Sequence, residues 1–379
     1  MNARASGGDP GAAVLVCLDS GAPADRDAIE EFRRLAESAG AMRQALVRGR
    51  RERPDPRYYA GSGKVEEIRA AAEALDAAFV LFNHALTPAQ QRNLEQALGR
   101  RVLDRTELIL EIFAQRAHTA EGRLQVELAR LEHLSTRLVR GWTHLERQRG
   151  GLGKTGGPGE TQLELDRRYL ADRVRALRAK LAELRRRRAL QRRARARRAV
   201  YSVSIVGYTN AGKSTLFNAL ARAGVEAADR LFATLVTTTR RLHLPGVPQV
   251  VLSDTVGFLR DLPHGLVAAF RATLEETVHA DLLLHVVDAS SAARARQAED
   301  VARVLAEIGA GDVPQIAVWN KIDRAGLPPG VERDGCGTIR RVFVSARTGA
   351  GLGELREAIA EAARLRRLRA ALHEAVPSI

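Results

Sequence analysis

Residues 207–214 read Gly207-Tyr208-Thr209-Asn210-Ala211-Gly212-Lys213-Ser214 and fit the pattern G-x-x-x-x-G-K-[ST]. An apolar, β-branched run at 201–206 precedes the motif, and residues 215–220 suit a helix that buries one face. Strand, glycine loop and helix together make a P-loop, whose backbone N–H groups hold phosphates at a helix N-terminus. The pattern predicts that Lys213 contacts the β and γ phosphates and that Ser214 binds Mg²⁺. The flanks disfavour the alternative, a chance glycine turn before a helix.

A second motif follows the next apolar strand, where Ser253-Asp254-Thr255-Val256-Gly257 ends the run that begins at Val250. Asp254 is expected to hold the water shell of Mg²⁺. The backbone N–H of Gly257 is expected to contact the γ-phosphate.

Two further motifs concern the base. The strand at 315–319 leads into Asn320-Lys321-Ile322-Asp323. The Asp323 carboxylate can accept hydrogen bonds from both N1–H and N2–H of guanine, a pair that adenine lacks, so this residue selects GTP over ATP. The strand at 341–344 ends at Ser345-Ala346-Arg347, whose backbone N–H groups are expected to meet the guanine O6.

The composition indicates a globular protein with aliphatic cores. The 379 residues suffice for two or three domains, and 45% are hydrophobic but only 4% aromatic. Cys17 and Cys336 cannot supply a disulfide framework or a cysteine-based metal site. No apolar run is long enough for a membrane span, and the N-terminus lacks a signal-peptide pattern. We expect a cytoplasmic protein that acts as a monomer.

The positive charge is concentrated in one block. The net charge is +15, and residues 141–200 hold 18 Lys and Arg against six Asp and Glu, an excess of 12. Nine arginines fall between 185 and 198. The block predicts a polyanionic partner, most plausibly RNA; a solvated, arginine-rich helix face is the alternative.

The block coincides with a predicted helical hairpin at 119–199. Leucines on a 4-3 spacing form two apolar stripes, and the second predicted helix runs from Thr161 to about Arg198. The tip, residues 150–160, contains six glycines, so its backbone can approach another molecule closely. We expect this tip to contact a large partner; the alternative is that it only links the two helices.

The N-terminal part predicts a small α/β domain at 11–118, after a disordered segment at 1–10. We expect a GTP-binding domain at 200–371 after the hairpin and a tail at 372–379, with any extra C-terminal domain missing or reduced to Ala370–Ile379. Within the first domain, Tyr58 to Lys64 opens a helix and could hold an anion there. We favour a glycine turn with Ser62 as the helix cap. The expected strands are 12–18, 42–47, 79–82 and 101–103, and the expected helices are 25–38, 63–75 and 87–98.

The four nucleotide motifs, in this order, resemble the translation-factor-related GTPases, which implies a Ras-like α/β fold with a mostly parallel sheet. The narrower resemblance is to the HflX GTPases and covers nearly all of residues 12–371. It is carried by Leu231-Phe232-Ala233-Thr234-Leu235, by Asp254-Thr255-Val256-Gly257-Phe258, and by Gly157-Pro158-Gly159-Glu160-Thr161-Gln162-Leu163-Glu164 in the hairpin.

The resemblance implies that Thr234 completes the Mg²⁺ sphere when GTP is bound, and that Lys213, Thr234 and Gly257 act in hydrolysis. The implied nucleotide-binding residues are Gly207, Tyr208, Thr209, Asn210, Ala211, Gly212, Lys213, Ser214, Thr215, Phe232, Ala233, Thr234, Leu235, Val236, Asp254, Thr255, Val256, Gly257, Asn320, Lys321, Ile322, Asp323, Ser345, Ala346 and Arg347.

The family also implies binding to the large ribosomal subunit and its rRNA, in splitting or rescue of ribosomes or in their biogenesis. The alternative is a nucleotide-gated RNA-binding or RNA-remodelling protein, with ATP use around Lys64. The residues expected to contact the ribosome are Gly153, Lys154, Gly156, Gly157, Gly159, Arg185, Arg188 and Arg193.

Several positions bear on this resemblance. Val236-Thr237 replaces the usual Asp-Pro, which makes Thr237 to Thr239 competitors of Thr234, and Lys154-Thr155 alters the hairpin tip. Phe258 stands where many GTPases place a glutamine that orients the attacking water, so intrinsic hydrolysis should be slow and stimulated by ribosomes. Asn210 resembles the P-loop asparagine that helps to hold K⁺ in some GTPases.

Overall fold

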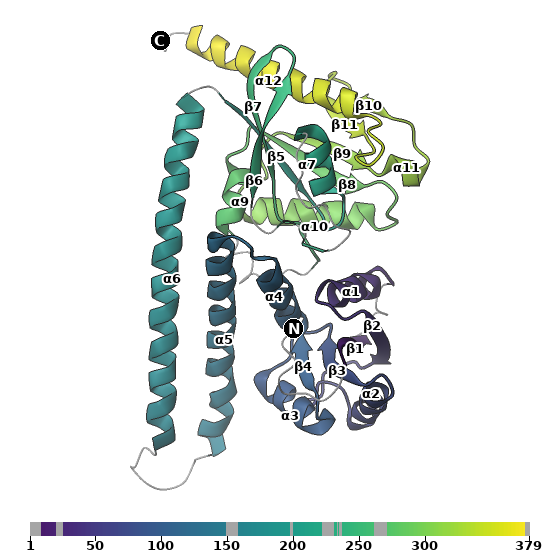
Figure 1. Ribbon diagram of the computed structural model, residues 1–379, viewed down its shortest axis with the longest axis vertical. Helices are drawn as coiled ribbons and strands as arrows, with labels where there is room; N and C mark the ends of the chain where they lie inside the picture. Colours follow the sequence, from purple (N-terminus) through teal and green to yellow (C-terminus); the bar gives the residue numbers. More distant parts are fainter. Residues whose placement is uncertain are drawn as a thin grey trace. The chain divides into compact units, whose positions relative to one another are not determined.

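The computed structural model describes residues 9–19, 26–148, 158–197, 200–221, 231–232, 234, 237–260 and 271–375. It divides into two compact units, Met1–Ala182 and Glu183–Ile379. Both contain parallel strands linked by helices, which confirms the predicted α/β class (Figure 1).

Unit 1 begins with a four-stranded parallel sheet in the order β2-β1-β3-β4. The central strands are almost continuously apolar because helices cover both faces of the sheet, and β3 is buried along its whole length. The strands are β1 (Asp9–Asp19), β2 (Arg43–Arg50), β3 (Ala77–Phe82) and β4 (Arg101–Asp104), and the helices are α1 (Arg26–Ser38), α2 (Ser62–Ala74), α3 (Pro88–Leu98) and α4 (Arg105–Arg116).

The prediction of disorder up to residue 10 is wrong at its end, since β1 begins at Asp9. The Asp9 backbone N–H donates to Asp76 O at 2.7 Å. Its carboxylate accepts from the Gly11 N–H and from the guanidinium of Arg43. Residues 1–10 are small and polar, which suggested disorder, but these contacts fix the start of the strand.

Two long helices, α5 (Ala120–Gln148) and α6 (Pro158–Arg197), run antiparallel and form the predicted hairpin (Figure 1). Leu128 on α5 and Leu177 and Leu181 on α6 are buried. Arg173 pairs with Glu127 at 2.6 Å, which ties the helices together. The second helix starts at Pro158, not at Thr161, because proline suits the first helical position, where no N–H is needed.

Unit 2 holds a seven-stranded sheet in the order β10-β11-β9-β8-β5-β7-β6, with only the two edge strands antiparallel to their neighbours. Helices α7 and α12 cover one face, and α9 and α10 pack on the other (Figure 1). Its strands are β5 (Tyr201–Gly207), β6 (Thr238–Leu244), β7 (Val247–Asp254), β8 (Leu282–Asp288), β9 (Gln315–Asn320), β10 (Gly330–Arg333) and β11 (Ile339–Phe343), and its helices are α7 (Lys213–Ala221), α9 (Arg271–Val278), α10 (Arg294–Glu307), α11 (Ile322–Ala325) and α12 (Leu352–Ala375).

The topology of unit 2 determines where the motifs meet. Strands β7, β5, β8 and β9 are parallel neighbours, so their carboxyl ends lie at one edge of the sheet. The P-loop, Asp254, Asp288 and Asn320 all stand at these ends. Ligands of open α/β sheets bind at such an edge.

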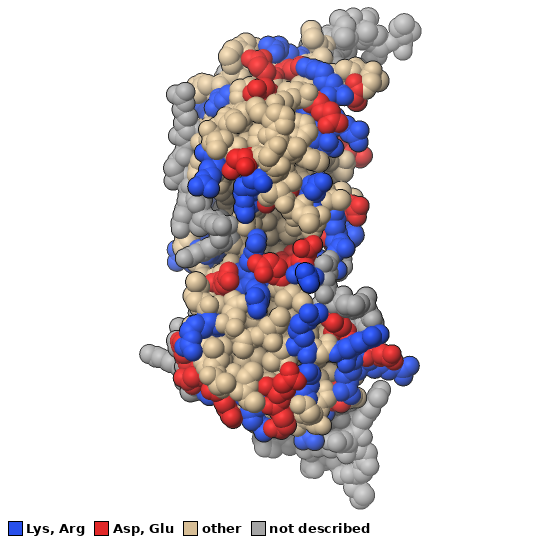
Figure 2. All heavy atoms as spheres, turned by 90° about the vertical axis from the view of Figure 1, so that its right-hand side faces the viewer, with Lys and Arg blue, Asp and Glu red and all other residues tan. Residues whose placement is uncertain are grey.

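Figure 2 shows the charged side chains on one face of the molecule. On the face drawn in Figure 2, basic and acidic side chains are interspersed among uncharged residues. Within the part of the chain that the structure describes, no helix combines the length and apolar character needed to cross a membrane.

Candidate nucleotide-binding site

The P-loop connects β5 to α7 through a backbone that requires glycine. Gly212 has a φ of 91°, and a Cβ there would collide with the side-chain amide of Asn320. Asn210 also adopts a positive φ, 61°. The loop is held from the next motif, since the Thr209 N–H donates to Phe258 O at 2.7 Å and the Phe258 N–H donates to Gly207 O at 3.1 Å.

Lys213 lies at the start of α7, with its side chain folded back over the loop. Its Nζ donates to Tyr208 O at 2.7 Å and is buried. Burial lowers the pKa of Lys213 to about 8, although the nearby Asp254 carboxylate opposes this shift. An anion at this place would restore the preference of the lysine for its charged form.

Three oxygen atoms converge beside Lys213. Ser214 Oγ and Thr234 Oγ1 both donate to Asp254 Oδ2 at 2.8 Å, and the two hydroxyls are 2.8 Å apart. Burial raises the pKa of Asp254, while Lys213 and the two hydroxyls oppose that shift. Among the described residues, Asp254 Oδ1 is buried without a hydrogen-bond partner. These hard oxygen donors and the unsatisfied carboxylate oxygen fit Mg²⁺ with its water shell.

The structure distinguishes among the competing threonines. Thr234 is 8% exposed and lies against Ser214 and Asp254. Thr238 and Thr239 belong to β6, where Thr239 Oγ1 lies 3.0 Å from Ser253 Oγ. The Thr234 hydroxyl therefore contacts both candidate metal ligands, whereas Thr238 stands opposite Asp254 in the pairing of β6 with β7 and Thr237 directly precedes β6.

The residues predicted to recognise guanine form a connected network. Asp323 Oδ1 accepts from Ser345 Oγ at 2.7 Å, which fixes the carboxylate. Asn320 joins two loops, because its Nδ2 donates to Ala211 O and its Oδ1 accepts from the Ala346 N–H, both at 2.9 Å. The Ser345 N–H donates to Ala350 O. Two of the three N–H groups predicted to meet guanine O6 thus already have acceptors.

Sequence reasoning missed Asp288, which ends β8. Lys321 Nζ donates to Asp288 Oδ2 and to Asn210 O, both at 2.7 Å. Burial would raise the pKa of Asp288, but hydrogen bonds from Lys321 and Ser290 outweigh it and hold the pKa below its usual value. The ion pair fastens the base-recognition loop to the P-loop. In the sequence, Asp288 is a lone aspartate at the end of a strand, with no motif around it to indicate a role.

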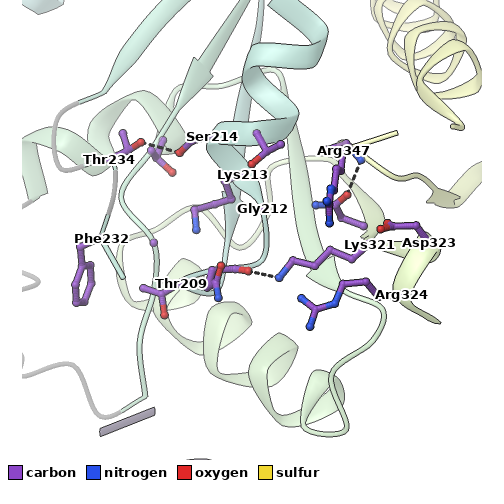
Figure 3. Close-up of a pocket in the computed structure, with 16 residues that line it drawn as sticks. Thr209, Gly212, Lys213, Ser214, Phe232, Thr234, Lys321, Asp323, Arg324 and Arg347 are labelled. Atoms are coloured by element: carbon purple, nitrogen blue, oxygen red, sulfur yellow. Dashed lines mark hydrogen bonds between the residues drawn. The ribbon is translucent and has the colours of Figure 1, made fainter. Parts of the chain in front are cut away.

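These residues surround one cavity of about 410 Å³ (Figure 3). Seven other described residues that were predicted to bind nucleotide do not line it: Gly207, Tyr208, Ala211, Asp254, Val256, Ile322 and Ser345. Arg324 lines the cavity and was not predicted. The full lining is Thr209, Asn210, Gly212, Lys213, Ser214, Thr215, Phe232, Thr234, Thr255, Gly257, Asn320, Lys321, Asp323, Arg324, Ala346 and Arg347.

Some predicted residues lie outside the described part of the chain. For the nucleotide site these are Ala233, Leu235 and Val236, and for the hairpin tip they are Gly153, Lys154, Gly156 and Gly157. Gly159 and Arg193 lie on α6, but the side chain of Arg193 is outside the described atoms.

Lys64 does not stand free beside an anion site. Its Nζ donates to Arg48 O at 2.8 Å and to Glu67 at 2.6 Å. Helix α2 begins at Ser62 and its N-cap is Gly61, without a side-chain cap bond, so the prediction of Ser62 as the cap is wrong.

At the carboxyl ends of the strands of unit 2 lie a P-loop after a buried strand, a hydroxyl–carboxylate cluster that could hold Mg²⁺ and a fixed aspartate that could accept from guanine. Together they define a P-loop GTPase. Comparison with known proteins identifies the family within this class. Residues 26–114, 116–195 and 202–321 match family models described as "GTP-binding GTPase N-terminal", "GTP-binding GTPase Middle Region" and "50S ribosome-binding GTPase".

GTPase HflX of Escherichia coli is 52% identical over 92% of this chain and 82% of its own length. GTPase HflX of Magnetococcus marinus is 51% identical over 88% and 78%. The chain belongs to the HflX family of GTPases and hydrolyses GTP. A solved complex of the protein SsGBP with GDP shares the fold, at 22% identity and a TM-score of 0.51 over 93% of this chain and 99% of that one.

Proposed function

We propose that this GTPase binds the large ribosomal subunit in its GTP state and acts in splitting, rescue or biogenesis of ribosomes, as a monomer in the cytoplasm. The observation that carries the proposal is the continuity of α6. This helix begins at the hairpin tip and runs without a break across the boundary between the two units. The matched description of residues 202–321, a 50S ribosome-binding GTPase, supports the same partner.

The catalytic roles follow from the cavity. Lys213 would neutralise charge on the β and γ phosphates, while Ser214 and Thr234 would ligate Mg²⁺ and Asp254 would bind its water shell. The N–H of Gly257 would sense the γ-phosphate. Mg²⁺ supplies charge neutralisation between the phosphates when it is bound.

The nucleotide state needs a route from the cavity to the hairpin, and α9 offers one. This helix follows the segment that begins at Gly257. Arg185 Nε on α6 lies 3.6 Å from Glu275 Oε1 on α9. Both residues line a groove that also includes Leu274 and His279. We assign Arg185 to this contact, so that movement of α9 alters α6. The predicted rRNA contacts then rest on Arg188, Arg193 and the glycine-rich tip.

The RNA-binding alternative makes a different prediction about the partner. A GTPase switch is expected to bind assembled large subunits at least about tenfold more tightly with a non-hydrolysable GTP analogue than with GDP, since a coupling of about 1–3 kcal/mol is typical of two-site linkage. Filter binding at two salt concentrations, with subunits and with protein-free rRNA, measures this. Equal affinity for both ligands in both nucleotide states would favour the simple RNA binder.

Asn210 carries the proposal of a K⁺ site. Its side chain lines the cavity, and its carbonyl oxygen is held by Lys321. A cation beside the phosphates would add one charge-stabilising group, which is typically worth about 10²-fold in rate. We expect hydrolysis to be faster in KCl than in NaCl at equal ionic strength, and Asn210→Ala to remove the difference. Equal rates of the unmodified protein in both salts would exclude the site.

A further inference from the structure

Arg324 is the cavity residue to which no motif gave a role. It lies on the one-turn helix α11, whose flanking residues Lys321 and Gly326 both have left-handed backbone, with φ of 64° and 66°. The turn is anchored to the sheet because the Ile322 N–H donates to Val344 O at 3.3 Å. The backbone of Arg324 is therefore fixed at the end of the cavity marked by Asp323.

The guanidinium of Arg324 is available to contact a ligand. It is exposed and lines the cavity, and within the described part of the chain its guanidinium takes part in no ion pair or hydrogen bond. In Figure 3, Arg324 and Arg347 lie on opposite sides of the Lys321 stem. Its neighbour Asp323, by contrast, is held by Ser345.

We propose that the guanidinium of Arg324 lies against the face of the bound guanine and slows release of the nucleotide. This rests on the assignment of the cavity as the nucleotide site. Asp323 engages the edge of the base, so an adjacent planar cation is placed to cover a face. A guanidinium stacks on aromatic rings better than an ammonium does, because it is planar and weakly hydrated.

The role proposed for Arg324 differs from that of Asp323 in how strongly it depends on the identity of the base. Hydrogen bonds to the edge read the pattern of donors, whereas stacking accepts any purine face. Removal of the guanidinium should therefore weaken the binding of guanine nucleotides and of hypoxanthine nucleotides by the same factor.

Stopped-flow release of fluorescent GDP and IDP tests the proposal. Arg324→Ala is expected to release both nucleotides about 3- to 30-fold faster, as expected for loss of one cation–π contact. Arg324→Lys keeps the charge but not the planar group, and should resemble Arg324→Ala. Arg340→Ala, at an exposed arginine outside the cavity, should match the unmodified protein.

The outcomes separate this proposal from the site on which it rests. Unchanged release from Arg324→Ala would overturn it, and so would normal release from Arg324→Lys, which would indicate a charge contact instead. If Arg324→Ala released GDP faster but released IDP at the rate of the unmodified protein, Arg324 would contact the edge of guanine, and the stacking proposal would also be overturned. If Lys213→Ala bound GDP as tightly as the unmodified protein, the nucleotide site itself would be misassigned.

Discussion

Large ribosomal subunits are expected to raise the rate of GTP hydrolysis by this protein at least about tenfold, since activator groups contribute roughly 10³–10⁵ in related reactions. The reason is the residue after Gly257. Phe258 is 1% exposed, and its backbone is bonded to Gly207 and Thr209. It does not line the cavity. This position therefore offers no group that orients the attacking water, and we expect a partner to supply one or to order the site.

Phosphate release under single-turnover conditions measures the effect. The control is the small subunit from the same ribosomes, at equal RNA mass and salt, because a basic helix binds any RNA electrostatically. Stimulation by both subunits to the same extent would mean that polyanions in general order the site. Equal rates with and without large subunits would contradict stimulation.

Lys213→Ala is expected to reduce GTP turnover by about 10²–10³, the usual cost of removing one group that stabilises transition-state charge. The second lysine that lines the cavity, Lys321, is held by Asp288 and by the backbone of Asn210 and so is not placed to replace it. The matched control is Lys180→Ala on the exposed surface of α6, which should leave turnover unchanged.

The same variant tests the alternative of ATP use in unit 1. Any ATP hydrolysis that survived in Lys213→Ala and disappeared in Lys64→Ala would place a second activity around Lys64. The contacts of Lys64 with Arg48 and Glu67 argue against that. Retention of most of the GTP turnover by Lys213→Ala would contradict the account of the P-loop.

The α/β fold class and the family could be predicted from the sequence because the relevant signals are local. A P-loop needs a strand, two glycines and a helix in succession, and the chain shows them within about twenty residues. The alternation of short apolar strands with helices likewise predicted the α/β domain at 11–118, and the resemblance to known GTPases implied the mostly parallel sheet of the second unit.

The features of the site that could not be predicted from the sequence depend on tertiary contacts. Asp288 acts only because β8 and β9 are neighbours, which brings it to Lys321. Thr234 differs from Thr238 and Thr239 by its place in space, not by its residue type. Arg324 faces the cavity because two left-handed residues turn α11, and these conformations are not readable from a single arginine after Asn320-Lys321-Ile322-Asp323.

Sedimentation with intact ribosomes tests the central claim most directly. The purified protein is run through a gradient with GDP or with a non-hydrolysable GTP analogue, and the positions of protein and subunits are recorded. We expect the protein to migrate with large subunits only with the analogue; loss of intact ribosomes there would indicate splitting, and their persistence would favour assembly or quality control. Absence of cosedimentation in both nucleotide states at moderate salt would contradict the claim that the large subunit is the partner.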